Sequence, residues 1–335
     1  MMRRGHKLAC SYVIVSEGRN QGLLSRMREA ASSIPGAALL SSFSDETYHR
    51  SSFTLAGFHE PLAQAALSIC RLAVQELDLT QHGREDVQAV HPRVGVVDLL
   101  PFYPLGEATT LQECGLLAAT VGKRLVDEFP TRASVAFFGA AHPLQRSLVE
   151  TRRATNFFSL GGSGKAGGPG LPPGRVEIKE SSVIDLGAYP VDQRTGLTVC
   201  GAMHYALNFN ILLDTFDLAY ARSIASRVRS SGGGPLPGVQ AMALSHKDGI
   251  EIACNLLQPE VSSPSQVLQL VQHLLQEEEK AKEDEGPTTN DKAQKKEEDE
   301  EHKTVEKKKV VVKHSYTIGL MVNEIYDQAV RALSL

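Results

Sequence analysis

HPRVGVVDLLPFYP, at residues 91–104, restricts the fold of this chain more than any other stretch. Residues 94–100 are mostly apolar and of strand length, so they predict a buried strand that contains one glycine. His91 stands just before this strand, followed by Pro92 and Arg93. An imidazole has an ordinary pKa of about 6.5, so His91 is suited to accept a proton near neutral pH. The chain has 11 histidines, and a plain loop histidine is the alternative.

The segments on either side of this stretch alternate between strand and helix patterns. Apolar residues at helical spacing in 61–77 predict an amphipathic helix. Another helix at 110–129 is expected to begin at Thr109 or Thr110, whose hydroxyl can cap its first turn. The other expected strands are 8–15, 37–40, 51–57, 134–138, 239–245 and 250–257, and the other expected helices include those after residue 21 and at 216–229, 265–275 and 319–333.

These elements form two successive sets of mixed β and α structure. Such a pattern predicts an α/β (α+β) fold with two subdomains, each a mixed sheet with helices packed on it. We place the first subdomain at residues 1–195 and the second at 196–335. The Gly- and Pro-rich stretch 160–174 is predicted to be a surface linker, because no helix follows its lysine as a phosphate-binding loop would require.

The formal charges are concentrated in one segment. Residues 277–309 hold 13 acidic and 9 basic residues, which leaves 26 of each sign elsewhere. A chain without a basic excess gives no support to nucleic-acid binding. The charged segment is predicted to be disordered or a frayed helix extension, inserted in a surface loop at little entropic cost. That it docks a basic partner is a hypothesis that rests on composition, and a solvated spacer is the usual case.

The cysteines indicate where the protein works. They are scattered, without a C-x-x-C pair, which favours free buried thiols in a reducing compartment and gives no support to a zinc site. We therefore expect a cytoplasmic protein that binds no metal. No apolar stretch is long enough to span a membrane, and residues 8–15 are more typical of a strand than of a signal peptide. The five residues are Cys10, Cys70, Cys114, Cys200 and Cys254.

Several stretches of the chain match one family in the family's own order. The chain resembles the formiminotransferase part of formiminotransferase–cyclodeaminase over nearly its whole length, apart from the charged insert. No stretch matches the cyclodeaminase half. The matching stretches are SEGRNQ (16–21), RSSFTLAG (50–57), HPRVGVVDLLPFYP (91–104), DLG (185–187) and TGLTVCGAMHYALNFNILL (195–213).

The resemblance implies a fold, an activity and a set of site residues. It implies two α/β subdomains with a folate-binding tunnel between them. It also implies transfer of a formimino group from N-formiminoglutamate to N5 of tetrahydrofolate, a co-substrate, as part of histidine catabolism and one-carbon metabolism. The family's catalytic histidine matches His91. Its folate-binding loop matches Gly187, Ala188, Tyr189, Pro190, Val191, Asp192, Gln193, Arg194, Thr195 and Gly196.

Two arginines are further candidates. Arg50 matches a family arginine, and together with Arg93 it is expected to hold a substrate carboxylate in bidentate fashion. A structural ion pair is an equally weighted alternative for both residues. The expected partners are small molecules, folate and formiminoglutamate, with neither nucleic acid nor membrane. The oligomeric state stays open, with a homodimer as one option.

The chain departs from the family where polar groups are expected. Ile14 replaces an asparagine and Phe43 replaces an acid, for which only Asp45 could substitute after a shift in register. Residues 153–158 lose the family's acids around Phe157, and Met203-His204 replaces a basic pair. An apolar residue cannot orient an amidinium, so stabilisation of the transition state is expected to fall. The two hypotheses are therefore a weak folate-dependent transferase and a non-catalytic folate-binding or scaffold relative.

Overall fold

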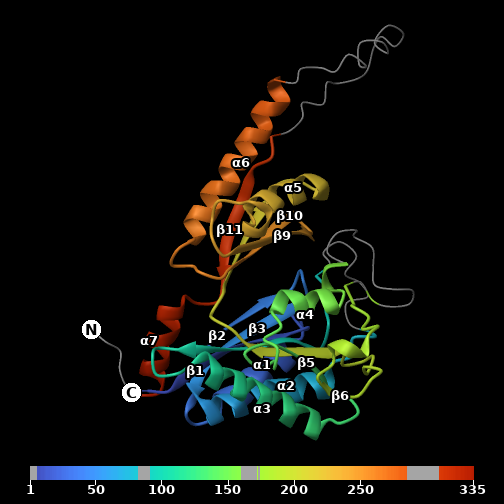
Figure 1. The fold of residues 1–335 in the computed structure, drawn as a ribbon, viewed down its shortest axis with the longest axis vertical. Helices are drawn as coiled ribbons and strands as arrows, with labels where there is room; N and C mark the ends of the chain where they lie inside the picture. The colour runs from blue at the N-terminus through green and yellow to red at the C-terminus, as the bar shows by residue number, and fades with distance from the viewer. Residues whose placement is uncertain (1–5, 82–90, 160–171, 173, 285–308) are drawn as a thin grey trace. The chain divides into compact units, whose positions relative to one another are not determined.

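The computed structural model describes residues 6–81, 91–159, 172, 174–284 and 309–335. It has a mixed α/β fold with two sheets and helices packed on them (Figure 1), which confirms the predicted fold class. The chain divides into two compact units. The first comprises Met1–Leu207, Leu244–Lys247 and Ile318–Leu335, and the second comprises Asn208–Ala243 and Asp248–Thr317.

The first unit is built on a seven-stranded sheet. One part, in the order β2-β3-β1-β4, is antiparallel throughout, whereas β4, β7 and β5 run parallel and β6 pairs antiparallel with β5. The parallel strands β4, β7 and β5 have their N-terminal ends on the same side of the sheet, and His91 lies just before the N-terminal end of β4. The strands are β1 (Leu8–Val15), β2 (Ala37–Asp45), β3 (Arg50–Phe58), β4 (Val97–Leu105), β5 (Ser134–Gly139), β6 (Leu186–Gly187) and β7 (Leu197–Ala202).

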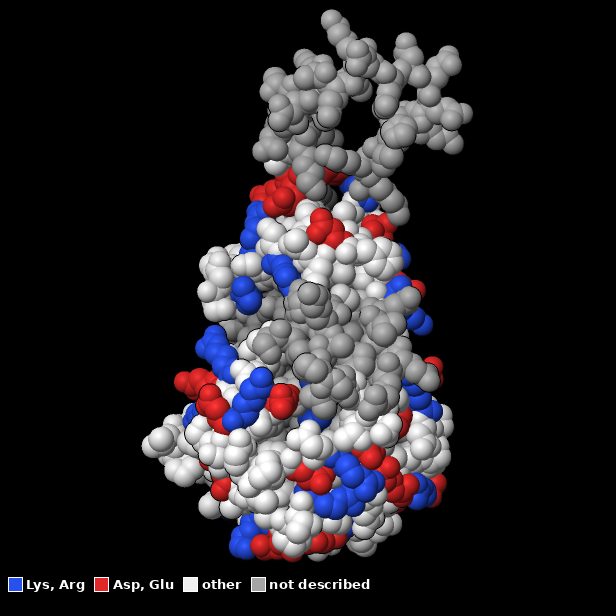
Figure 2. Space-filling view, turned by 90° about the vertical axis from the view of Figure 1, so that its right-hand side faces the viewer, with Lys and Arg blue, Asp and Glu red and all other residues white. Residues whose placement is uncertain are grey.

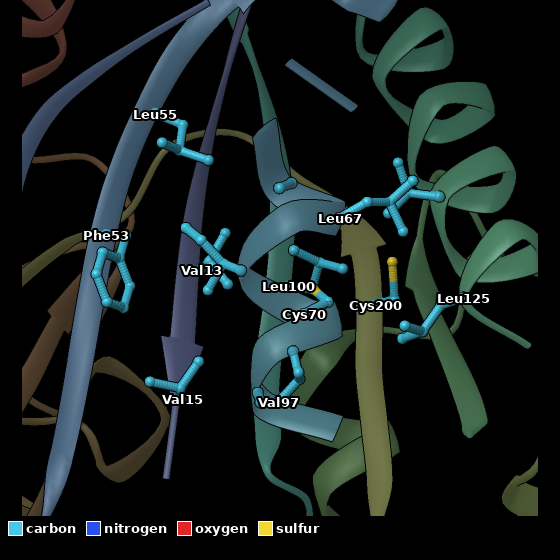
Figure 3. Packing of buried hydrophobic residues seen from close by; sticks show 14 of the residues in the cluster. Val13, Val15, Phe53, Leu55, Leu67, Cys70, Val97, Leu100, Leu125 and Cys200 are labelled. Carbon is cyan, nitrogen blue, oxygen red and sulfur yellow. The ribbon is translucent and has the colours of Figure 1, made fainter. Parts of the chain in front are cut away.

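Both faces of this sheet are buried at β1, whereas β2 is partly exposed. In β1, Ala9, Val13 and Val15 face a core formed with the helices α1 (Gln21–Ser32), α2 (His59–Glu76) and α3 (Leu111–Glu128). Figure 3 shows this packing, with Leu67 and Cys70 among residues of the sheet. The intervening residues of β1 pack in a second cluster with α7 (Val322–Ala332). Alternate side chains of a strand point to opposite faces, which explains why β1 is apolar on both faces apart from Ser11, whose hydroxyl donates to the Pro101 carbonyl.

Capping residues fix where two helices of the first unit begin. The Thr110 hydroxyl accepts the Glu113 N–H, and the Glu113 carboxylate accepts the Thr110 N–H in return, which confirms the predicted start of α3. Ser147 and Glu150 form the same capping box at α4 (Leu148–Ala154). The short η1 helix (Phe157–Ser159) follows α4 after two intervening residues.

The second unit contains a four-stranded sheet, in the order β11-β8-β10-β9. The predicted hairpin at 239–257 forms β9 and β10, joined at Lys247 and Asp248. The elements are β8 (Leu207–Leu213), β9 (Val239–His246), β10 (Gly249–Leu256), β11 (Val312–Ile318), α5 (Leu218–Val228), α6 (Pro264–Asp284) and the short η3 (Ser230–Gly232). The short η2 (Ser181–Val183) belongs to the first unit.

The charged segment begins as regular structure. Residues 277–284 continue α6, and Arg227 of α5 donates to both Glu277 and Glu278, at 3.0 Å for Glu278. Of the two forms expected for this segment, disorder or a helix extension, its first part has the second, and its acidic side chains meet a cation on a neighbouring helix. Residues 285–308 lie outside the described residues, as do 160–171 and 173 of the predicted linker.

Two strands differ from the prediction for reasons that involve pairing. β4 continues through Pro101 and Pro104, although proline cannot donate to a ladder. The β1–β4 ladder omits Pro101, whose carbonyl accepts the Ser11 hydroxyl at 2.9 Å, and Pro104 lies beyond the β4–β7 ladder. β7 pairs between β4 and β5 in the first sheet. The subdomain boundary at residue 195 stays a proposal, while contacts place β7 and α7 in the first unit.

Surface and thiol properties agree with the composition. Figure 2 shows basic and acidic side chains interspersed over the face in view, without a large field of one sign. All five cysteines are buried and free, as predicted, and burial raises the pKa of Cys70 to about 12. Such thiols are poor nucleophiles. Among the described residues, no helix is both long enough and apolar enough to cross a membrane.

Candidate active site

His91, Arg50 and Asp98 come together where β3 and β4 of the seven-stranded sheet begin. Arg50 is the first residue of β3, His91 lies just before β4, and Asp98 is the second residue of β4. Arg50 Nη1 lies 2.8 Å from His91 Nε2, and Arg50 Nη2 lies 2.6 Å from Asp98 Oδ2. The guanidinium of Arg50 therefore connects the imidazole to a buried carboxylate.

These contacts fix the tautomer of His91. A guanidinium can only donate, so His91 Nε2 accepts the hydrogen bond from Arg50. The other ring nitrogen, Nδ1, lies 2.8 Å from the Pro92 carbonyl oxygen, which can only accept. His91 is consequently the neutral Nδ1–H tautomer, and its basic nitrogen faces Arg50.

The surroundings of His91 disfavour its protonated form. Burial, and next the positive charge of Arg50, hold the pKa of His91 well below its ordinary value; Arg152 and Arg93 act in the same direction. The hydrogen bond to Pro92 opposes this shift but does not outweigh it. His91 is therefore neutral at neutral pH, as a proton acceptor must be before it acts.

Asp98 organises this edge of the sheet. Its Oδ1 accepts the Val94 N–H at 2.7 Å, while its Oδ2 holds Arg50. The Asp98 side chain is 1% exposed and the Arg50 side chain 14% exposed, so the ion pair is almost entirely removed from water. Arg50 is thus in the structural ion pair that was its alternative role, and its binding of a substrate carboxylate stays a proposal.

Arg93 is too deeply buried to be accessible to a substrate in this structure. It is 2% exposed, and its Nη2 donates to the Tyr48 carbonyl at 3.3 Å. Its backbone pairs with Arg175, whose Nη1 donates to the carbonyls of Val94 and Val176 at 2.9 Å. The proposal that Arg93 clamps a substrate together with Arg50 gains no support from this geometry.

The predicted folate-binding loop, 187–196, ends beside the segment that carries His91. The Leu197 N–H donates to Val94 O at 3.0 Å and the Val96 N–H to Thr195 O at 2.8 Å. Gly196 has a φ of +70°, and a Cβ there would lie 2.3 Å from Val94 O, so only glycine permits this approach. Stretches about 100 residues apart in sequence are thereby adjacent.

The rest of that loop is held by its own polar residues. Asp192 Oδ1 accepts the N–H groups of Arg194 and Thr195 at 3.0 and 2.9 Å, a turn in which an aspartate replaces a backbone acceptor. Tyr189 precedes a cis proline and is 50% exposed. The loop thus offers an exposed aromatic ring on a backbone that is fixed in place.

Aromatic rings enclose His91. Tyr48 and Phe157 lie edge-on to the imidazole, with ring centroids 5.8 and 5.9 Å away. Phe157 is 2% exposed and stands in the segment where the family has acids. The Arg152 guanidinium lies over the Phe157 ring, 4.5 Å from its centroid. The departure at Phe157 therefore places an apolar ring directly against the candidate base.

Two other departures lie on β1 and β2. Phe43 is 37% exposed on β2, and Ile14 is buried on β1. Asp45 Oδ1 accepts the N–H groups of Thr47 and Tyr48, both at 2.9 Å, so its carboxylate stabilises a turn. Asp45 pointing into the site would have favoured the transferase, and Phe43 filling it would have favoured the non-catalytic relative. Asp45 instead stabilises a turn and Phe43 is partly exposed, so neither hypothesis gains.

One polar pair was not predicted from the sequence. Glu17 Oε1 lies 3.0 Å from His49 Nε2 and also accepts the N–H groups of Arg19 and Asn20. Both residues are buried. The SEGRNQ match was the available signal for Glu17, but nothing in the spacing connects it to His49. Within the described ranges, no three His, Cys, Asp or Glu residues form a group that could hold a metal ion.

Comparisons with known proteins agree on one family. Residues 8–203 match the family model described as formiminotransferase domain, N-terminal subdomain. A formiminotransferase cyclodeaminase-like protein of Arabidopsis thaliana is 31% identical over 279 residues, which cover 81% of this chain and 89% of the relative. A glutamate formimidoyltransferase of Streptococcus pyogenes serotype M1 is 32% identical, covering 65% of this chain and 67% of the relative.

The relatives with a second activity in their names are longer. The formimidoyltransferase-cyclodeaminase of Rattus norvegicus is 30% identical over 269 residues, which cover 78% of this chain but 46% of the rat protein. The match therefore extends over less than half of that bifunctional relative. By its family model and by these relatives, the chain belongs to the formiminotransferase family.

Proposed function

We propose that this protein transfers a formimino group from N-formiminoglutamate to N5 of tetrahydrofolate, with His91 as general base and then general acid. One observation carries the proposal: the fixed tautomer of His91 presents a neutral, basic Nε2. The names of the glutamate formimidoyltransferase relatives support the donor and the group transferred. Tetrahydrofolate enters as a co-substrate.

The proton balance requires one such group. N5 attacks the amidine carbon, and a new N–C bond forms while the C=N π bond opens. N5 must then lose a proton, which His91 Nε2 accepts. The C=N π bond then re-forms as the bond from that carbon to the glutamate nitrogen breaks, and the imidazolium returns the proton to this leaving nitrogen. The balance closes with the formimino group on N5, glutamate released and His91 neutral again.

Arg50 affects both halves of this cycle. While Arg50 donates to Nε2, the lone pair of His91 is engaged, so Arg50 Nη1 must withdraw before N5 can transfer its proton. Asp98 keeps hold of Arg50 through the second nitrogen. An imidazolium beside a guanidinium is a stronger acid than an imidazolium alone. Arg50 therefore favours proton transfer from His91 to the glutamate nitrogen and disfavours proton transfer from N5 to His91.

The loop at 187–196 is proposed to bind the folate. It ends at the backbone pairing with the His91 segment, and its exposed Tyr189 ring is suited to contact an aromatic co-substrate. A tunnel between the subdomains, a cytoplasmic location and a place in histidine catabolism and one-carbon metabolism remain predictions that depend on this activity.

A non-catalytic folate-binding relative is the second candidate function. Two observations favour it: His91 Nε2 is already occupied by Arg50, and Phe157, a ring without an acceptor, lies against the imidazole. Under this proposal the loop binds folate, but no proton is exchanged with His91.

Two measurements separate these functions. Calorimetric titration with folinic acid tests folate binding, and a turnover assay with N-formiminoglutamate and tetrahydrofolate tests transfer. His91→Gln should lower turnover by roughly 10²–10⁴-fold while folinic acid still binds. His273→Gln, on the exposed part of α6, is the matched control and should behave as the unmodified protein.

The outcomes are distinct. Folinic acid binding without any turnover would favour the non-catalytic relative. Turnover that is unaffected by His91→Gln would show that His91 is not the base. If neither binding nor turnover is observed, both candidate functions fail.

A further inference from the structure

Arg152 is a part-buried cation, and no anionic side chain pairs with it among the described residues. It lies in α4, part-buried, with its guanidinium over the Phe157 ring. Within the described residues, its guanidinium makes no hydrogen bond and no ion pair. Guanidinium groups removed from water are normally paired with an anion, because desolvating an unpaired charge is costly. A cation held in this way is typical of a site that receives its anion from a ligand.

The electrostatics around Arg152 point to the same conclusion. Burial lowers the pKa of Arg152 to about 10, which still leaves it protonated at neutral pH; Asp98 opposes the shift and Arg50 adds to it. Asp98 is already engaged by Arg50 and by the Val94 N–H. One carboxylate thus faces two guanidinium groups, so this region carries an excess positive charge although the chain outside its charged insert is neutral.

The position of Arg152 relative to His91 sets the size of the ligand. Phe157 touches both residues, at 4.5 Å from the Arg152 guanidinium carbon and 5.9 Å from the His91 ring centre. The guanidinium and the imidazole are therefore no more than about 10 Å apart, the sum of these distances. A hydrogen bond of about 2.8 Å at each end leaves at most roughly 5 Å for the ligand. This length suits a short carbon chain between a carboxylate and a reacting nitrogen.

We propose that Arg152 binds a carboxylate of the amino-acid donor and thereby positions the donor's reacting carbon at His91. The inference rests on the proposed transferase function and adds the residue that recognises the donor. Arg50 is committed to Asp98 and Arg93 to the backbone at Tyr48, whereas the planar fork of Arg152 matches a carboxylate in bidentate fashion. The ligand class is an N-acylated or N-formimidoylated dicarboxylic amino acid.

The test measures binding of N-formylglutamate by calorimetry, with mono-methyl esters of each of its two carboxylates. Arg152→Met should weaken binding of N-formylglutamate roughly 10–100-fold, the loss of one charge-assisted bidentate contact. Arg152→Met should not weaken binding of the ester in which the carboxylate that contacts Arg152 is methylated. Arg153→Gln removes the same charge from an exposed neighbour on the same helix and should leave binding unchanged. Arg152→Lys keeps the charge and should recover part of the loss, which also serves if Arg152→Met does not fold.

Each outcome has a clear meaning. Equal weakening by Arg152→Met and Arg153→Gln would overturn the inference, since the effect would then be one of net charge. Equal weakening of the diacid and of both esters would also overturn it. If folinic acid binds and the donor turns over, but Arg152→Met leaves donor affinity and KM unchanged, the proposed function stands and the role of Arg152 fails. If folinic acid does not bind at all, the proposed function itself fails.

Discussion

Asp98→Asn should destabilise the first unit far more than its single changed atom suggests. The amide keeps an oxygen for the Val94 N–H but presents a donor to Arg50, which then stays largely buried without a counter-ion. Removing one partner of a buried ion pair costs about 3–5 kcal/mol. Because the Arg50 side chain is 14% exposed, water can reach it in part. We therefore expect a loss at the lower end, about 3 kcal/mol.

The assay is urea denaturation followed by far-UV circular dichroism, because the chain has no tryptophan to report unfolding. The two compact units can unfold separately, so the transition of the first unit is fitted on its own. Asp127→Asn is the matched control. It breaks a surface pair in which Lys123 and Asp127 are 67% and 60% exposed, worth about 0.3–0.5 kcal/mol. A loss for Asp98→Asn no larger than that of the control would refute the reasoning.

Three further predictions concern His91 and its neighbours. The folded state keeps His91 neutral well below pH 6.5, whereas the unfolded imidazole binds a proton there, so the free energy of unfolding should fall as pH drops below about 6.5, by at most about 1.4 kcal/mol per pH unit from this group. His91→Gln should remove that part of the slope in urea titrations, and an unchanged slope would contradict the assignment. Arg50→Met should raise the pKa of His91 in an NMR titration, whereas Arg50→Lys, which keeps the charge, should raise it less; equal values would exclude Arg50 as a cause. Gly196→Ala should prevent folding or lower the melting temperature strongly, because its Cβ would meet Val94 O at 2.3 Å, while Gly233→Ala, at φ +86° with open space around it, should cost only about 1–2 kcal/mol; similar losses would mean that the contact at Gly196 is soft.

The periodic patterns of the sequence predicted most elements of the fold. Residues 8–15, 61–77 and 110–129 form the expected strand and helices to within two residues at either end, and Thr110 caps α3 as its hydroxyl suggested. These features depend on local interactions, the spacing of apolar residues and the satisfaction of helix-end N–H groups, which any window of the chain contains.

The assignment of elements to units could not be predicted in this way. The apolar run of β7 would suit either sheet, and only pairing with β4 and β5 places it in the first. The return of α7 to the first unit, after a segment of the second, is decided by its packing on β2 and β3. β4 extends past the predicted end at residue 100, and each of its two prolines takes part in one ladder only, Pro101 with β7 and Pro104 with β1.

The sequence by itself determined that this chain is an α/β protein of the formiminotransferase family and that His91 is its candidate base, because those conclusions rest on residue types in fixed order. Only the tertiary structure decided what surrounds the base. Arg50 is 41 residues from His91 and 48 residues from Asp98 in the sequence. Arg152 is near His91 because Phe157 contacts both residues. From the sequence alone, an arginine that pairs with a carboxylate cannot be told from an arginine that is available to a ligand. They differ only in which side chains the folded backbone brings within hydrogen-bonding distance.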